Sequence, residues 1–159
     1  TTVYAADAAA PLKALLVDVE GWEAEDAEGM SVNMGGISMT NAFREYTSGD
    51  DKLINATIIA GTSAMVDSWM AEGDISYEDD SAETKVNSSE IDGFSVIRTH
   101  TEADGDVTGY VVVQMVKGEQ QGAMLAITYE SVSQEDALAF AKKFDWKKIK
   151  SACAAVLGE

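Results

Sequence analysis

The chain has 159 residues, about the length of one domain, and its 28 acidic and 11 basic residues give a formal charge of −17 at pH 7. With one histidine and one cysteine, it lacks the residues that most serine and cysteine hydrolases and thiolate metal sites require. The negative charge disfavours binding to nucleic acid and to anionic membrane surfaces.

Residues 1–10 are expected to be a disordered remnant of a removed secretory signal. The small residues Val3, Ala5 and Ala6 have the spacing that a signal peptidase accepts. An ordinary alanine-rich start is the alternative. The sequence has no run of about 18 apolar residues, which predicts no transmembrane segment. We therefore expect a periplasmic or extracellular bacterial protein in which residues 11–159 form a single domain.

The pattern of the first half of the chain predicts a helix, then a β-hairpin, then a second helix. Pro11 begins a helical pattern of apolar residues that continues to Val19 and stops at Gly21. A short strand is possible over 29–36. Residues 38–47 show a two-residue alternation, and residues 53–60 include the β-branched Ile54, Thr57, Ile58 and Ile59. These patterns predict a hairpin closed by a turn at 47–51. The apolar face of 63–70 predicts a central helix.

The second half predicts strands over 84–88, 94–101, 107–117 and 123–130. Asp92-Gly93 and Asp104-Gly105 are typical of tight hairpin turns. Ser133 is the expected N-cap of a helix that reaches Phe144, and Asp145 is that of a last helix over 146–157.

These elements predict an α+β fold, a single antiparallel sheet of about six strands packed by N-terminal, central and C-terminal helices. Tight turns rather than crossover helices join most strands, which disfavours a parallel sheet.

Four short motifs of this chain also occur in a loosely defined group of uncharacterised exported bacterial proteins, which the sequence therefore resembles. They are Gly21-Trp22, Arg44-Glu45-Tyr46 before Gly49-Asp50, Ile91-Asp92-Gly93, and the helix from Ser133 that leads to Asp145-Trp146. The element order is similar to the PsbP/Mog1-like fold. The resemblance implies an architecture, and it transfers no catalytic residue.

The clearest candidate metal ligands are Glu102, Asp104 and Asp106, because alternate carboxylates in a loop can chelate calcium. The alternative is that Asp104-Gly105 is only a hairpin turn. The three adjacent acids at 78–80 are a second candidate. His100 is interpreted as a surface or turn-adjacent histidine, and Cys153 as a small buried apolar residue. No cofactor other than calcium is suggested.

Basic residues are concentrated near the C-terminus, where a partner is most expected to bind. They are Lys142, Lys143, Lys147, Lys148 and Lys150. We predict an exported, non-enzymatic binding or assembly protein that binds a partner, a small ligand or copies of itself, and these lysines are where we expect a protein partner or another copy to make contact. The alternatives are a weakly calcium-binding acidic protein and, less favoured, a carboxylate-dependent hydrolase.

Overall fold

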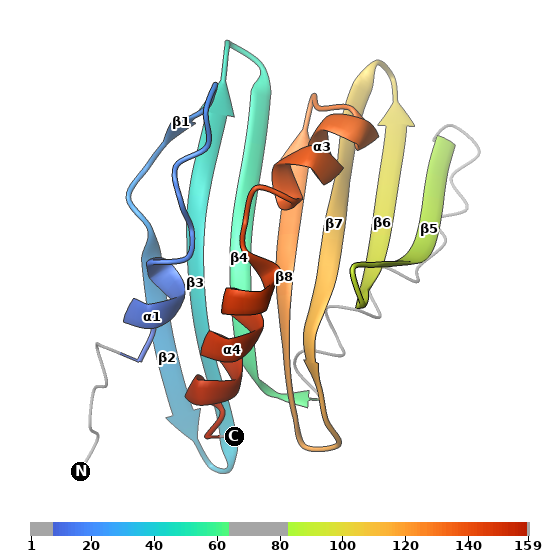
Figure 1. Ribbon diagram of the computed structural model, residues 1–159. Coiled ribbons are helices and arrows are strands. Elements are labelled where there is room, and N and C mark those ends of the chain that lie inside the picture. Colours follow the sequence, from blue (N-terminus) through green and yellow to red (C-terminus); the bar gives the residue numbers. More distant parts are fainter. Residues whose placement is uncertain (1–7, 64–82, 159) are drawn as a thin grey trace.

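The computed structural model describes residues 8–63 and 83–158, and within them the chain forms an eight-stranded antiparallel sheet (Figure 1). The strand order is β1-β3-β4-β8-β7-β6-β5, and β2 pairs with β3 beside β1. The strands are β1 (Glu23–Ala24), β2 (Glu28–Met34), β3 (Ile37–Ser48), β4 (Lys52–Thr62), β5 (Glu83–Ile91), β6 (Phe94–Ala103), β7 (Asp106–Lys117) and β8 (Gln121–Glu130).

The hairpin turns follow from local chemistry. Asp92 and Gly93 have φ of 52° and 84°, and Asp104 and Gly105 have φ of 52° and 82°. A two-residue turn with positive φ at both positions matches the twist of the strands that it joins. The β5–β6 and β6–β7 turns predicted at these dipeptides are thereby confirmed.

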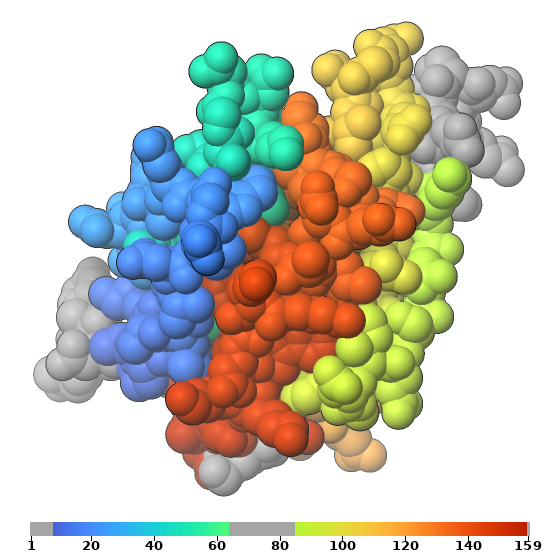
Figure 2. All heavy atoms as spheres, turned by 45° about the horizontal axis from the view of Figure 1, so that its top comes forward, coloured from blue at the N-terminus to red at the C-terminus, as the bar shows by residue number. Residues whose placement is uncertain are grey.

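Within residues 8–63 and 83–158, three helices cover one face of the sheet (Figure 1). They are α1 (Ala10–Lys13), α3 (Gln134–Ala141) and α4 (Trp146–Val156). Ser133 and Asp145 cap α3 and α4 through their side chains, as predicted. Figure 2 shows α3 and α4 filling the middle of this side, between the blue N-terminal segment and the yellow-green β5 and β6.

The main core lies between these helices and the sheet. Alternate residues of the central strands point into it, as the two-residue period of a strand requires. Its largest fully buried side chain is that of Tyr46. The opposite face carries a smaller cluster of Ile59, Val112, Met124 and Ala126. No helix in the described ranges is long and apolar enough to cross a bilayer.

The expected fold class is wrong in its proportions. The sheet has eight strands rather than about six, and the helices are small additions to it rather than three packing layers. The strands beyond the expected six are β1, which was not predicted, and β2, which lies at Glu28–Met34 where a short strand over 29–36 was considered. Both pair with β3. The predicted central helix over 63–70 falls almost wholly outside the described residues.

The N-terminal helix is also shorter than its apolar pattern predicts. It ends at Lys13, although the predicted face extends to Val19. Side chains of β3 hold the segment that follows α1. Arg44 donates to the carbonyl of Leu16 at 2.7 Å, and the Tyr46 hydroxyl donates to that of Val17 at 2.7 Å. The carbonyls after the shortened helix are thus satisfied by β3 rather than by a further helical turn.

Candidate functional site

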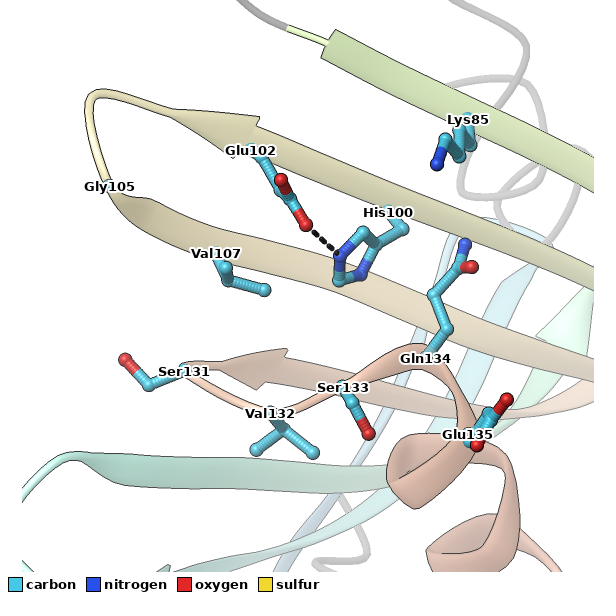
Figure 3. A pocket seen from close by; sticks show the side chains of 10 residues that line it. All are labelled: Lys85, His100, Glu102, Gly105, Val107, Ser131, Val132, Ser133, Gln134 and Glu135. Carbon is cyan, nitrogen blue, oxygen red and sulfur yellow. Dashed lines mark hydrogen bonds and ion pairs between the residues drawn. The ribbon is translucent and has the colours of Figure 1, made fainter.

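Two hollows on the helix-bearing side have charged side chains in their walls. The first, which we call the His100 cleft, has a volume of ≈ 560 Å³ and lies between the ends of β6 and β7 and the start of α3 (Figure 3). The second, the lysine hollow, has a volume of ≈ 490 Å³ and lies where the β5–β6 turn meets the junction of α3 and α4.

The wall of the His100 cleft combines charged, polar and apolar residues. They are Lys85, His100, Glu102, Gly105, Val107, Ser131, Val132, Ser133, Gln134 and Glu135. In Figure 3 the side chains of Lys85, Glu102 and Gln134 approach His100 from β5, β6 and α3. The Ser133 hydroxyl accepts a hydrogen bond from the amide of Asp136 at 3.1 Å, and this bond caps α3.

His100 is buried and held at both ring nitrogens. Its Nδ1 lies 2.7 Å from the Tyr129 hydroxyl oxygen, and its Nε2 lies 3.3 Å from Oε1 of Glu102. The Tyr129 hydroxyl donates in turn to the Thr99 carbonyl at 3.2 Å. All three contacts are satisfied at once when both ring nitrogens of His100 carry a hydrogen.

Tyr129 stays protonated in this network. Burial raises the pKa of its phenol to about 12, and the charge of Arg98 opposes this shift. A phenol that keeps its proton remains a donor to Thr99 at neutral pH. The network therefore ties β6 to β8, and its polar groups are engaged with one another rather than presented to a ligand.

Gly109 provides the space that the Tyr129 phenol occupies. A Cβ at this position would overlap the Thr99 carbonyl oxygen and the Tyr129 ring. We therefore expect Gly109→Ala to lower the free energy of unfolding by about 1–3 kcal/mol, the usual cost of overpacking. Urea unfolding measures this loss. Gly105→Ala, which has open space around its Cβ, tests turn strain alone. An unchanged midpoint for Gly109→Ala would contradict the expectation.

The interpretation of His100 as a surface residue is wrong, since its exposed fraction is only 7%. Its partner Tyr129 is 29 residues away in the sequence, so no local motif connects the two. One signal was available. His100 is in phase with Val96 on β6, and Val96 belongs to the core face.

The three predicted metal ligands are placed by the β6–β7 hairpin. Glu102 contacts His100, Asp104 occupies the first turn position, and Asp106 pairs with Ala103 at the start of β7. Within residues 8–63 and 83–158, no three potential ligands are grouped so that they could hold a metal ion. The hairpin turn accounts for the presence of an aspartate at position 104. Calcium binding stays a prediction. The acids at 78–80 lie outside the described ranges.

The predicted lysine set is exposed, and the structure divides it. Lys142 and Lys147 line the lysine hollow, and Nζ of Lys150 lies 5.9 Å from the ring centre of Phe94 in its wall. Lys143 and Lys148 are also exposed but do not line it. The other lining residues are Asp92, Phe94, Phe144, Asp145 and Trp146.

Aromatic rings give the lysine hollow a rigid apolar floor. Phe94 and Trp146 meet edge to face with their ring centres 5.6 Å apart, a favourable aromatic geometry. The indole Nε1 of Trp146 donates to the Ala141 carbonyl at 2.8 Å, which fixes the ring at the junction of the two helices. Asp145 is partly committed, because its carboxylate accepts from the amide of Lys148.

Cys153 lies at the inner face of α4 and is fully buried, as predicted. Burial raises the pKa of its thiol to about 12. A thiol with this pKa is protonated at neutral pH, which makes it a poor nucleophile and a poor metal ligand. Cys153 therefore belongs to the core rather than to a site.

Sequence comparisons identified no relative of this chain. No known protein family matches the chain, and no curated protein shows significant sequence similarity to it.

Proposed function

We propose that the protein is a non-enzymatic binding protein and that its lysine hollow binds an acidic segment of a partner protein. The observation that carries the proposal is the gathering of Lys142, Lys147 and Lys150 around an aromatic floor. In a chain with a formal charge of −17, residues 142–150 hold five of the eleven basic side chains. An acidic partner repelled by most of this surface would be attracted here.

The chemistry of the hollow favours a mixed contact. Pairs between exposed lysines and carboxylates are worth only about 0–1 kcal/mol each, so charge alone gives weak binding. An apolar side chain of the partner that rests on Phe94 and Trp146 would add the burial of apolar area. Asp92 and Asp145 at the edge disfavour a uniformly anionic ligand. The preferred ligand is thus an acidic peptide segment that contains an apolar or aromatic residue.

The test uses two double variants with the same charge. Lys142→Glu with Lys147→Glu alters the hollow, and Lys143→Glu with Lys148→Glu alters the neighbouring positions at the end of α3 and in α4, outside the hollow. Each pair changes the formal charge by −4, from −17 to −21. The probe is a synthetic peptide of glutamates around one phenylalanine, with affinity measured by fluorescence anisotropy at low and high salt.

We expect the variant in the hollow to bind the peptide roughly ten-fold more weakly than the unaltered protein, or about 1.4 kcal/mol. The matched pair should change affinity by no more than about half of that free energy. Binding of the unaltered protein should also weaken with salt. If both double variants lost the same affinity for the peptide, overall charge rather than the hollow would explain the binding. If neither variant lost affinity, the hollow would be excluded as the binding site.

A further inference from the structure

One edge of β2 has no partner strand within the described ranges. On its other side β2 pairs with β3 through all seven of its residues. Each of these seven residues is exposed. The outer backbone N–H and C=O groups of such a strand are a template for another extended chain. The chemistry of this edge therefore selects a β-strand as its partner.

β2 lacks several of the features that usually protect an edge strand. It contains no proline and no lysine, its pairing with β3 has no bulge, and Glu28 at its start is its one charged residue. α1 packs against β2 at Gly29, on the helix-bearing face. The opposite edge of the sheet is different, because β5 carries the charged and exposed Lys85 and Glu90. Of these two edge strands, β2 therefore carries fewer charged residues that oppose pairing with another strand.

An exposed apolar strip borders this edge. The register of β2 with β3 places its members together on the face opposite the helices. They are Met30, Val32, Met34, Ile37 and Phe43, with exposed fractions of 52%, 40%, 75%, 50% and 40%. A partner strand that brought its own apolar residues to this face would bury the strip.

We propose that β2 pairs antiparallel with β2 of a second copy of the chain, about a two-fold axis at Ser31. In this register Met30 lies opposite Val32, and Gly29 opposite Asn33, in both directions. Glu28 lies opposite Met34, so the two glutamates are at opposite ends of the interface and no like charges meet. Two chains of charge −17 can approach here because this strip is nearly uncharged. The result is one continuous sheet with both apolar strips on the same face.

The first test is the oligomeric state of matched lysine variants. Val32→Lys places a charge in the strip, and Val86→Lys places the same charge on β5, where Val86 is exposed to 51% on the same face of the sheet. Light scattering after size-exclusion chromatography should show dimers of the unaltered protein at high protein concentration and high salt, where repulsion is screened. Val32→Lys should weaken the dimer at least about ten-fold, and Val86→Lys should not.

The second test traps the register. A cysteine at the two-fold axis faces its own copy across the antiparallel pair, at the Cα separation of about 4.5–5.5 Å that a disulfide accepts. Ser31→Cys should therefore cross-link under mild oxidation. Asn33→Cys should not, since its copies lie four residues apart along the strands, or about 14 Å. Cys153 is buried and does not compete.

Three results would overturn the proposal. They are a strictly monomeric protein at high concentration and salt, equal effects of Val32→Lys and Val86→Lys, and an unlimited ladder of oligomers. The ladder would indicate pairing of β2 with β5, which does not close. Circular dichroism of each variant establishes that a monomer is folded.

Discussion

Between pH 9 and pH 12 the folded protein is expected to lose about 4 kcal/mol of its free energy of unfolding through the thiol of Cys153. Burial raises the pKa of this thiol from 9.0 to about 12. Below pH 9 the thiol is protonated in both the folded and the unfolded chain, and its contribution to stability is complete. At higher pH the thiol ionises in the unfolded chain alone, which lowers the free energy of the unfolded state relative to the folded one. This loss of stability ends when the folded thiol also ionises near pH 12.

Cys153→Ala isolates this contribution. Urea unfolding at a series of pH values gives the free energy of unfolding of both proteins, and their difference should change by about 4 kcal/mol between pH 9 and pH 12. Tyr129, whose pKa burial also raises to about 12, acts in both proteins and cancels in the difference. Parallel curves for the two proteins would refute the expectation. A thiol reagent that modified the native protein rapidly at pH 8 would also contradict it.

The hairpins of the second half were predictable because their signals are local. The predicted strands over 94–101, 107–117 and 123–130 lie within one or two residues of β6, β7 and β8 at each end. Asp104-Gly105 alone specifies the turn between the first two, through the positive φ of both residues. Alternation and turn chemistry act over a few residues, and sequence patterns report such effects well.

The number of strands and the path of the chain after the first helix depend on contacts between distant residues. β1 has two residues, and all seven residues of β2 are exposed, so neither shows a strong pattern of alternating burial. The segment after α1 is held by Arg44 and Tyr46, about 30 residues later, which donate to the carbonyls of Leu16 and Val17. Helical periodicity reports the buried face, and Leu16 and Val19 are indeed buried without being helical.

The candidate site shows the same limit. The lysines of 142–150 stand out in the sequence, but only the packing of α3, α4 and the β5–β6 turn separates Lys142 and Lys147 from Lys143 and Lys148. Phe94 and Asp92 join the hollow from about 50 residues away. The partner of His100 was equally hidden, because Tyr129 reaches it across β7.

Truncation of Tyr46 should lower the free energy of unfolding strongly, because this is the largest fully buried side chain of the main core. It is fully buried, and its ring lies edge to face with Phe140 and Phe144, with ring centres 5.0 and 6.2 Å apart. We expect Tyr46→Ala to cost about 3–5 kcal/mol, as truncation of a buried aromatic ring does. Chemical denaturation followed by tryptophan fluorescence measures the loss.

Tyr46→Phe separates the hydroxyl from the ring. It keeps the contacts with Phe140 and leaves the Val17 carbonyl without the donor that Tyr46 supplies at 2.7 Å, for an expected cost of about 1–3 kcal/mol. Tyr110→Phe is the matched control, since the Tyr110 hydroxyl is buried and has no hydrogen-bond partner among the described residues. Its removal should be neutral or slightly stabilising. If both phenylalanine variants had the same stability, the bond to Val17 would contribute nothing to the free energy of unfolding.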